Sequence, residues 1–480
     1  MKFPFKSLED WIAFLESKKQ IIRNSKEVEV RNEISAISKK VAQTQGPAVL
    51  HDNILGYPGW HIFHDGLTTR ERVAWSLGVQ QENFLDNILN VLREAKPVKP
   101  KIVDTGPCKE VKIFGEDIDL TYLPIAFSTE LEAPPYITAG MSNIRDPETC
   151  WQNTAIRRFQ LKGKRRLNNL VLPFQHEGMI FQKYIQRKEP APIAIVVGAD
   201  PLYYLMSQLP AAPQEDEIDL WGAIAGEPLE VVPCETSEIL VPANAEIVLE
   251  GEMDPEAREL EGIFPEFTGY NSIFRRAPIV NIKAVTMRKQ PIYYYMYNGI
   301  PVSESMTIGP VMMEVQFYRQ LKELVPEVVD IALLSTWGGV TVVSVDKNVR
   351  TKVPGLVKKI AFAVKTLKAS PFVKNLVVVD DDMDVRDPHQ VFWCFSTRFQ
   401  GAKDINVIPG AAGSFLDPSE PWLDWLGGGY GHTSYSIFDC TEKMPPYDVG
   451  YRRGLGRPDA EVWKRIEKEW GSTGFLKEGT

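Results

Sequence analysis

The sequence predicts a multidomain α/β protein (α+β multidomain), in which two α/β segments flank a central segment that is mostly β-structure. A chain of 480 residues has room for about three domains of ordinary size. Helical periodicity alternates with short apolar runs in the first and last thirds, whereas the middle carries runs rich in β-branched and aromatic residues. We therefore expect an N-terminal α/β domain over 1–115, a central domain over 116–300, a linker helix over 301–324 and a C-terminal α/β domain with a tail over 325–480.

The N-terminal segment is expected to begin with an amphipathic helix. Ser7 and Asp10 have the spacing of a capping box, and the residues from Leu8 to Leu15 place their apolar side chains on one helical face. A second helical pattern runs from Phe84 to Leu92. It stops before Pro97, where an extended, polar run leads toward the edge of the domain.

The central segment is expected to be built from strands. The runs Ile193–Val197 and Ala245–Leu249 are short and apolar, which is typical of buried strands. The runs Ile279–Met287 and Pro291–Tyr297 are rich in β-branched and aromatic residues, and they predict a hairpin that turns at Lys289-Gln290.

The C-terminal segment returns to alternating helices and strands. After a long helical stretch that ends at Leu324, we expect strands at Val328–Leu334, Val340–Val345 and Leu376–Val379, with a helix over 354–367. This order predicts a third domain of the α/β type.

The composition excludes several classes of protein. Hydrophobic residues make up 44% of the chain and charged residues 24%, as in ordinary globular proteins. The 54 basic and 63 acidic residues give a formal net charge of −9, which argues against an overall nucleic-acid-binding surface. No apolar run reaches the roughly 18 residues of a membrane span, and the five scattered cysteines form no disulfide framework. We expect a cytoplasmic protein without a membrane anchor.

A basic segment is the first candidate site. It begins with Asn153-Thr-Ala-Ile-Arg157-Arg158, continues with lysines and arginines to Arg166, and is followed by Gln175-His176. Taken alone, the segment is typical of a solvated basic hairpin. Binding of single-stranded nucleic acid or another polyanion through 157–166 is an alternative, although Phe159 is the only aromatic residue in the run.

Two carboxylates form the second candidate site. Glu261 and Glu266 are separated by Gly-Ile-Phe-Pro, which prevents a regular helix and favours a loop that turns both side chains into one cleft. Neighbouring carboxyls repel, so that one stays ionised while the other becomes a proton donor. The alternative is a solvated acidic surface, since the preceding residues 250–259 are also rich in acids.

The third candidate is a set of hard metal ligands. Asn153, His176 and Glu217 offer an amide oxygen, an imidazole and a carboxylate, which suit Mn²⁺ or Mg²⁺. Their separation in the sequence does not show that they meet, and a single histidine is more often a core residue. No dinucleotide-binding, P-loop or H-E-x-x-H motif is present.

In this order, the motifs resemble those of the UbiD family of prenylated-FMN-dependent (de)carboxylases, over residues from about 5 to 445. The resemblance rests on five matches: Asn153–Arg158, Gln175-His176, the stretch Glu217–Val232, Glu261–Glu266 with Thr-Gly-Tyr after it, and Val378-Val-Asp-Asp-Asp-Met-Asp. It departs from the common family pattern at Ile263 and Pro265, and at Ile437-Phe-Asp-Cys-Thr441, where the family reads I-D-A-T.

The resemblance implies a fold and an activity. The central domain would be a flavin-binding split β-barrel, and the C-terminal domain would mediate oligomers. The chain would be a carboxy-lyase that reversibly decarboxylates an aromatic or α,β-unsaturated acid, with prenylated FMN as the electron sink. Arg158, Glu261 and Glu266 would be the catalytic set, in which Arg158 holds the carboxylate, Glu261 supports Arg158 and Glu266 donates the proton.

The resemblance also implies ligands and partners. Asn153, His176 and Glu217 would bind Mn²⁺ (or Mg²⁺) against the cofactor phosphate, with K⁺ as a further ion. The cofactor would be lined by those three residues and by Ile156, Arg157, Arg158, Leu170, Val171, Leu172, Gln175 and Lys368. Expected partners are the acid substrate, CO₂, a flavin prenyltransferase that supplies the cofactor, and further copies of the chain in a dimer or hexamer, but no nucleic acid and no membrane.

The substrate is expected to be conjugated and largely apolar. Attachment to the flavin requires a π-system next to the carboxylate, and a wall from the C-terminal domain would help to enclose it. Tyr293–Tyr295, Tyr297 and Phe392–Phe395 are candidate stacking faces, with the alternative that these aromatic side chains belong to the core.

Overall fold

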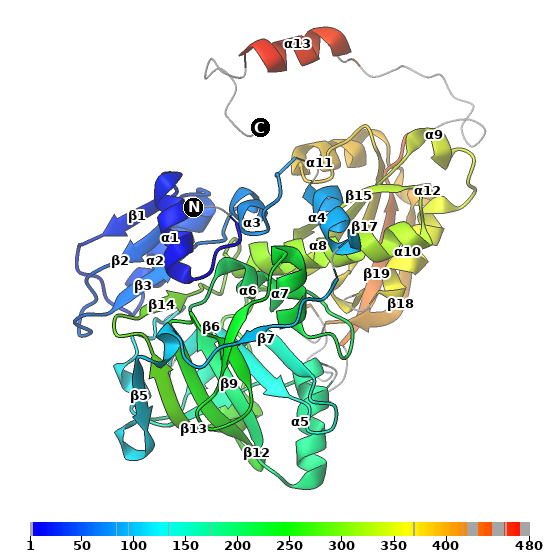
Figure 1. Ribbon diagram of the computed structural model, residues 1–480. Coiled ribbons are helices and arrows are strands. Elements are labelled where there is room, and N and C mark those ends of the chain that lie inside the picture. The colour runs from blue at the N-terminus through cyan, green and yellow to red at the C-terminus, as the bar shows by residue number, and fades with distance from the viewer. Residues whose placement is uncertain are drawn as a thin grey trace. The chain divides into compact units, whose positions relative to one another are not determined.

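The computed structural model describes residues 3–82, 84–94, 96–132, 134–173, 175–367, 370–414, 416–419, 431–443, 456 and 458–470. The chain divides into two compact units, 1–441 and 442–480. The larger unit contains an N-terminal sheet, a small sheet, a central barrel and a C-terminal sheet (Figure 1). The mixed α/β fold predicted from the sequence is confirmed.

The N-terminal sheet has the strand order β1-β2-β3-β14. Its first helix begins as the sequence predicts, because the Ser7 side chain accepts a hydrogen bond from the backbone N–H of Asp10 at 3.1 Å. The bounds are β1 (Ile21–Asn24), β2 (Ala48–His51), β3 (His61–His64), β14 (Ile292–Tyr295), α1 (Leu8–Ser17), α2 (Glu33–Gln43), α3 (Arg70–Ser76) and α4 (Phe84–Glu94).

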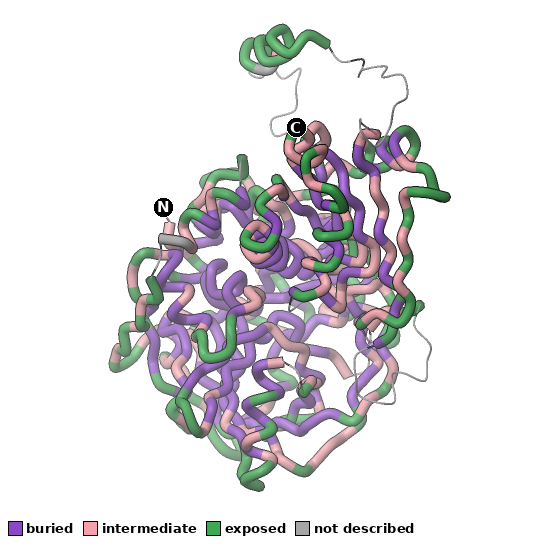
Figure 2. The backbone as a smooth tube through the Cα atoms, turned by 90° about the vertical axis from the view of Figure 1, so that its right-hand side faces the viewer, coloured by how far each residue is buried: buried purple, intermediate pink, exposed green. Residues whose placement is uncertain are grey.

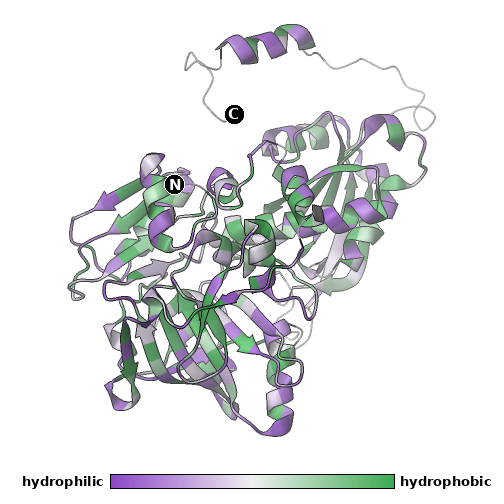
Figure 3. Cartoon of the chain, in the orientation of Figure 1, coloured by the Kyte–Doolittle hydropathy of each residue, from purple (hydrophilic) through white to green (hydrophobic). Residues whose placement is uncertain are grey.

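The central segment forms a closed barrel of six strands, in the order β12-β9-β6-β7-β8-β13. β12 also pairs with β13, which closes the barrel, and β5 adds to β13 at the outside. The interior is apolar, and Figure 3 shows hydrophobic stretches along these strands. The bounds are β5 (Val111–Phe114), β6 (Tyr136–Arg145), β7 (Gln152–Leu161), β8 (Arg166–Asn169), β9 (Ala191–Val197), β12 (Ile247–Glu261) and β13 (Arg275–Met287).

The predicted hairpin across Lys289-Gln290 is wrong. β13 stays in the barrel, whereas β14 leaves it and pairs in parallel with β3. Lys289-Gln290 lacks the residues that adopt the backbone of a tight hairpin turn. Glu246 fixes the departure instead, because its carboxylate accepts from the Ile292 N–H at 3.0 Å and lies 3.1 Å from Nε of Arg288.

A small sheet and three helices lie against the barrel. The sheet has the order β11-β10-β4, in which β10 and β4 run parallel. The bounds are β4 (Lys101–Ile102), β10 (Glu230–Pro233), β11 (Leu240–Pro242), α5 (His176–Arg187), α6 (Pro201–Met206) and α7 (Glu217–Ala225), with short 3₁₀ turns η1 (Pro107–Lys109), η2 (Gly115–Asp117) and η3 (Leu120–Tyr122).

Helix α8 (Ser305–Leu324) leads to the C-terminal sheet, within the range predicted for a linker helix. Its buried Glu314 is 2.6 Å from Nη1 of Arg70 in α3 and 3.7 Å from Nη2 of Arg386, which follows β17. One carboxylate on α8 therefore contacts side chains from the N-terminal and C-terminal segments.

The C-terminal sheet has the order β15-β16-β17-β19-β18, with parallel pairing in its centre. The predicted strands and helix of this segment are present. The bounds are β15 (Val328–Ser335), η4 (Thr336–Gly338), β16 (Val340–Val345), α9 (Lys347–Arg350), α10 (Leu356–Thr366), η5 (Ser370–Phe372), β17 (Asn375–Asp380), α11 (Pro388–Thr397), α12 (Gly401–Asp404), β18 (Ile405–Gly413) and β19 (Gly431–Asp439).

Buried residues run through all the sheets of the larger unit and through α8 (Figure 2). The smaller unit contains α13 (Ala460–Trp470), whose described side chains are mostly exposed. Among the described residues, no helix combines the length and apolar character that crossing a membrane requires. The division into domains at 115, 300 and 324 stays a prediction.

Candidate active site

A cavity of about 420 Å³ collects most of the residues that the sequence singled out. It is lined by β7 and the segment after β8, by 207–211 after α6, by the start of α8, and by loops of the C-terminal sheet. A volume of this size is within the range of roughly 300–1,000 Å³ that small-molecule and cofactor sites occupy.

Arg158 and the two predicted carboxylates meet at this cavity. Nη2 of Arg158 donates to Oε2 of Glu261 at 3.0 Å, and Nε lies 2.8 Å from Oε1. Nη1 donates to Oε1 of Glu266. The side chains of Glu261 and Glu266 are only 0% and 8% exposed, so the acidic pair is not a solvated surface. The ring of Phe264 lies 4.5 Å from the guanidinium and supports it from one side.

The loop after β12 places these side chains. Gly262 has φ 127°, which a residue with a side chain rarely adopts, and lets the chain leave the strand sharply. Two hydrogen bonds join Phe264 and Ser272 across the loop, at 3.0 Å and 2.7 Å. The N–H of Gly269 donates to the carbonyl of Glu266 at 2.9 Å, so a tight turn begins at Glu266.

Burial and charge set the protonation of the cluster. Burial raises the pKa of Glu266, and the neighbouring Arg158 opposes this shift only in part. Burial alone would lower the pKa of Arg158, but Glu266 and Glu261 together raise it. Burial, with Glu261 beside it, also raises the pKa of Tyr136, which the sequence analysis missed. Glu266 therefore holds a proton more readily than an ordinary glutamate does.

Two of the predicted metal ligands contact each other at the cavity. Nδ2 of Asn153 donates to Oε1 of Glu217 at 3.0 Å, and the Thr154 N–H donates to Oε2 at 2.8 Å. His176 lines the same cavity and packs edge-on against Trp151, with ring centroids 4.9 Å apart. Burial raises the pKa of Glu217 to about 8, a cost that a bound cation would offset.

The three predicted metal ligands, Asn153, His176 and Glu217, include only one histidine and one acid. Among the described residues, no group of three or more His, Cys, Asp and Glu side chains is arranged to hold a metal ion. The amide oxygen of Asn153 could join an ion here only if the amide turns away from its hydrogen bond to Glu217.

Most of the predicted cofactor-lining residues border the cavity. They are Asn153, Ile156, Arg157, Arg158, Leu170, Leu172, Gln175, His176 and Glu217. Val171 packs against the barrel core instead. Lys368 lies outside the described residues. Among the described residues, Oε1 of Gln175 is buried without a hydrogen-bond partner, which leaves an acceptor for a bound molecule.

Glu177 is a residue beside the cavity that the sequence analysis did not single out. Its buried carboxylate accepts from Nε of Arg157 at 2.5 Å, from Oγ of Ser142 at 2.7 Å and from Nδ2 of Asn169 at 2.8 Å. Strands β6, β7 and β8 are thereby joined to the first turn of α5, and Arg157 is fixed at the cavity. The signal in the sequence was the acid directly after His176.

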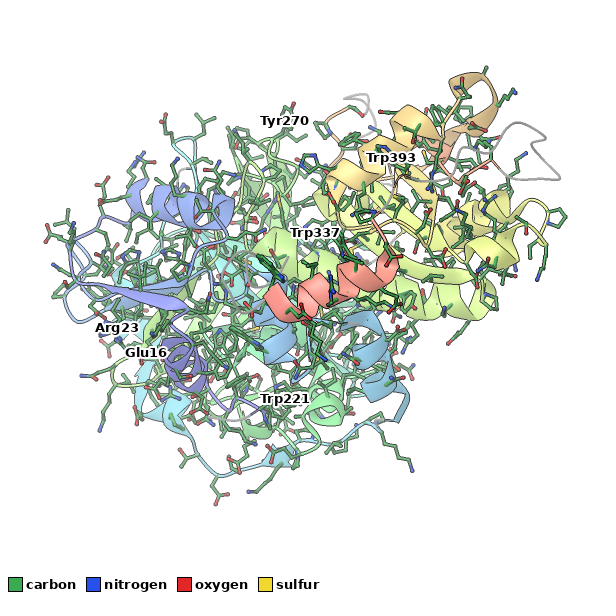
Figure 4. All side chains as sticks on the ribbon, turned by 90° about the horizontal axis from the view of Figure 1, so that it is seen from above. Glu16, Arg23, Trp221, Tyr270, Trp337 and Trp393 are labelled. Carbon is green, nitrogen blue, oxygen red and sulfur yellow. The ribbon has the colours of Figure 1, made fainter. Side chains whose placement is uncertain are left out.

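The aromatic wall of the cavity is not the predicted one. Tyr293–Tyr295 and Tyr297 belong to the core, which is the alternative that the sequence left open, and the segment Phe392–Phe395 is absent from the lining of the described cavity. Phe267, Trp337 and Phe372 form the wall instead. Trp337, labelled in Figure 4, follows β15 and packs on α8. An aromatic residue in the sequence indicates burial, not the partner that its ring contacts.

The basic hairpin after Arg158 is largely neutralised by the chain itself. Strands β7 and β8 do form a hairpin, with exposed basic side chains at its turn. Each of three of these side chains contacts a carboxylate, and the pairs are Lys164 with Asp119 (2.9 Å), Arg165 with Glu116 (2.6 Å) and Arg166 with Glu259 (2.6 Å). This arrangement disfavours a polyanion-binding surface.

Family models match three parts of the chain. The N-terminal, Rift-related and C-terminal domains of 3-octaprenyl-4-hydroxybenzoate carboxy-lyase match residues 12–92, 101–301 and 306–440. These are the UbiD N-terminal, central and C-terminal models, and they follow one another in the same order as the segments described above.

Solved enzymes are similar over nearly the whole chain. Vanillic acid decarboxylase from Sedimentibacter hydroxybenzoicus, in closed form, is 30% identical, with a TM-score of 0.84 over 97% of this chain and 99% of that one. The UbiD-class enzyme HmfF from Pelotomaculum thermopropionicum, in complex with FMN, is 32% identical, with a TM-score of 0.82 over 95% and 100%. An evolved dimeric form of HmfF in complex with prFMN is 30% identical, with a TM-score of 0.80 over 96% and 100%.

The domain models and the solved enzymes agree with the motifs of the sequence. Glu266, Arg158 and the Asn153–Glu217 pair border one cavity, and the buried Glu261 contacts Arg158 from behind the lining. The chain belongs to the UbiD family, and it is a carboxy-lyase.

Proposed function

We propose that the chain is a reversible, non-oxidative decarboxylase, or carboxylase, of an aromatic or α,β-unsaturated carboxylic acid. The observation that carries this proposal is a single cavity that joins the Arg158 cluster to the Asn153, His176 and Glu217 set and ends at an aromatic wall. Vanillic acid decarboxylase is the relative whose substrate supports the choice of an aromatic acid.

Arg158 holds the substrate carboxylate. Its planar guanidinium can grip a carboxylate at two points, and a charge-assisted hydrogen bond of this kind contributes roughly 1.5–3 kcal/mol. Glu261 engages Nε and Nη2, which fixes the plane of the guanidinium. Nη1 now donates to Glu266, and a substrate carboxylate would take over this contact.

Glu266 supplies the proton that replaces CO₂. The C–C bond to the carboxylate breaks, CO₂ leaves, and the same carbon receives the proton of the Glu266 carboxyl. The raised pKa of Glu266 supports this role, because an acid that is buried keeps its proton until the carbon is ready to accept it. In the carboxylation direction the same carboxylate removes the proton.

Prenylated FMN, when bound, supplies the electron sink that no protein side chain offers. The residues of the cavity fit it: Gln175 presents a buried acceptor without a partner, and Arg157 presents a cation held by Glu177. Asn153, His176 and Glu217 would hold Mn²⁺ or Mg²⁺ against the phosphate, with K⁺ as a further ion. A flavin prenyltransferase would supply the cofactor.

Reconstitution tests the activity. The purified chain is loaded with prenylated FMN, and a series of acids is assayed by product analysis. We expect turnover of conjugated acids such as hydroxylated benzoates and no turnover of cyclohexane carboxylate. Equal rates for conjugated and saturated acids would rule out the proposed chemistry.

The ligand set is tested separately. His176→Ala should lower both the Mn²⁺ content and the retained flavin, measured by elemental analysis and by absorbance, while Cys150→Ala, an exposed site, leaves both unchanged. Equal metal and flavin content in the His176→Ala variant and the wild type would remove the assignment.

A further inference from the structure

The loop that carries Glu266 is held at two places by aromatic side chains. Before Glu266, the buried Phe264 lies with its ring 4.8 Å from that of Tyr136 on β6, and its N–H is bonded to Ser272. After Glu266, Phe267 stands on the tight turn and points away from the barrel to Trp337, with ring centroids 5.3 Å apart. Only Pro265 and Glu266 lie between the two anchors, and the backbone N–H of Glu266 donates to the carbonyl of Tyr270 at 2.9 Å.

The second anchor is a three-ring cluster, defined here as Phe267, Trp337 and Phe372. Phe372 lies 6.0 Å from each of the other two rings, and all three border the cavity. Trp337 and Phe372 come from loops of the C-terminal sheet, whereas Phe267 comes from the barrel. The position of Phe267 therefore depends on a part of the chain that contacts neither Arg158 nor Glu261 in the interactions described above.

Trp337 has a backbone that a bulky residue seldom adopts. Its φ of 55° and ψ of 35° lie in the left-handed region. Its indole is seated directly on Gly309 of α8, where a Cβ would come within 2.5 Å of the ring. The strained backbone and the glycine together hold the indole against Phe267.

We propose that Trp337 is a positioning residue for Glu266 and acts through Phe267. The indole fixes the turn that starts at Glu266, and the turn fixes the carboxyl relative to Arg158. The C-terminal domain thereby controls proton transfer to the substrate carbon, while the grip of Arg158 on the carboxylate does not depend on it. This inference rests on the proposed role of Glu266 as proton donor.

The first test needs neither cofactor nor substrate. Amide hydrogen exchange of residues 262–272 is measured by mass spectrometry in the cofactor-free chain. Trp337→Ala should exchange at least tenfold faster in this loop and unchanged in β12, and Trp337→Phe should restore most of the protection. Phe392→Ala, an exposed aromatic site of α11, is the matched control and should change nothing. Unchanged exchange in Trp337→Ala would overturn the proposal.

The second test separates proton transfer from C–C cleavage in the loaded enzyme. Trp337→Ala should slow the exchange of solvent deuterium into the product at least tenfold, while the exchange of ¹³CO₂ into the substrate stays within threefold of the wild type. Equal losses in both exchanges would make Trp337 a substrate wall only and would refute the positioning role.

Variants of Phe267 test whether Trp337 acts through this residue. Phe267→Ala should give the same split, and the double variant should be no slower than either single variant, because both act through one contact. Additive losses would contradict the proposal. If the wild type shows neither exchange, the proposed function has failed, and the amide exchange of the loop still decides whether Trp337 positions it.

Discussion

Arg158 contacts the carboxylates of Glu261 and Glu266 through different edges of its guanidinium. Glu261 takes Nε and Nη2, and Glu266 takes Nη1. A lysine ammonium has no such edges, because its three protons radiate from a single atom. The separate contacts of the two glutamates with Arg158 therefore depend on the shape of the cation as well as on its charge.

Arg158→Lys is expected to lower turnover at least tenfold, which corresponds to about 1.4 kcal/mol or more of transition-state stabilisation. The ammonium keeps the charge but loses the two-point grip that orients the carboxylate. Steady-state kinetics of the loaded enzyme measure this change. Arg165→Lys, at the exposed turn of the hairpin, should be silent, and a silent Arg158→Lys would remove the assigned role.

Glu266→Gln is expected to stop proton transfer while the flavin stays bound. The amide keeps the shape of the side chain but has no acidic proton to give. Product formation should fall at least a hundredfold, about 2.7 kcal/mol, with flavin absorbance within 20% or so of the wild type. Turnover at the wild-type rate, with equal solvent deuterium in the product, would mean that the proton comes from another group.

The sequence singled out the residues proposed to react more readily than the residues that hold them. Arg158, Glu261 and Glu266 were found because they lie in two short motifs, Asn153–Arg158 and Glu261–Glu266. Glu177 and Trp337 were not, because their roles depend on contacts with strands and loops far away in the chain. Such contacts leave no periodic signal.

At the scale of elements, the start of α5 has no space for a side chain at Gly178. A Cβ on Gly178 would lie 2.0 Å from the backbone carbonyl oxygen of Leu172, which belongs to the segment that lines the cavity. A backbone atom cannot move aside as the end of a flexible side chain can. The helix therefore needs a glycine in its first turn, where alanine would otherwise be the better helix former.

Gly178→Ala is expected to destabilise the fold and to lower flavin retention together. The clash should outweigh the gain of roughly 1 kcal/mol that alanine brings inside a helix, so the midpoint of thermal unfolding should fall. Gly401→Ala in α12 is the control, since its Cβ would meet only Phe399 at 3.8 Å. Equal midpoints for Gly178→Ala and the wild type would show that the segment at Leu172 shifts freely.

Helix α8 begins next to a buried acid. The carboxylate of Glu304 accepts from the N–H groups of Asp65 and Leu67 and from the hydroxyl of Tyr294. Burial, with Asp65 nearby, raises the pKa of Glu304 well above its ordinary 4.5. The folded chain therefore holds this proton more tightly than the unfolded chain does.

This acid makes the stability depend on pH. The contribution of the Glu304 proton is complete below about pH 4.5 and is lost as the pH rises toward the folded pKa, with a slope of up to about 1.4 kcal/mol per pH unit. Glu304→Gln should flatten that part of the profile, measured by urea unfolding between pH 5 and 8. Glu238→Gln, at a side chain that is 91% exposed, is the control and should leave the pH dependence of the unfolding free energy unchanged. An unchanged pH dependence in Glu304→Gln would mean that Glu304 is ionised at every pH tested.

The elements show where sequence patterns are sufficient. Amphipathic helices such as α1 were predicted because burial follows a local period, and strands such as β16 because a short run of β-branched residues is buried almost throughout. The partner of β14 was not, because the apolar character of a strand does not say which sheet it joins.

For the whole molecule, the sequence resemblance predicts an assembly through the C-terminal domain. Strand β18 is the last strand of its sheet, and Val407 on it is 53% exposed. Phe392 on α11 is 68% exposed, so apolar surface lies on two elements of this domain. The relative HmfF has been solved in an evolved dimeric form.

Light scattering with size-exclusion chromatography tests the assembly. The wild type should elute at two or six times the 54.2 kDa of one chain, and Val407→Lys should shift it toward one chain, because a lysine on an edge strand opposes pairing with a second copy. Phe114→Lys, on the barrel, is the control and should keep the wild-type mass. A wild type that remains at the mass of one chain at all concentrations would contradict the prediction.

The parallel pairing of β14 with β3 has a consequence for biosynthesis. The N-terminal sheet gains its last strand only when residue 295 has left the ribosome, whereas β3 is complete at residue 64. At a synthesis rate of roughly 5–20 residues per second, the edge of β3 stays without β14 for about 10 to 50 seconds. The unpaired backbone groups of such an edge can pair with other chains. A nascent chain stalled before residue 292 should therefore bind chaperones.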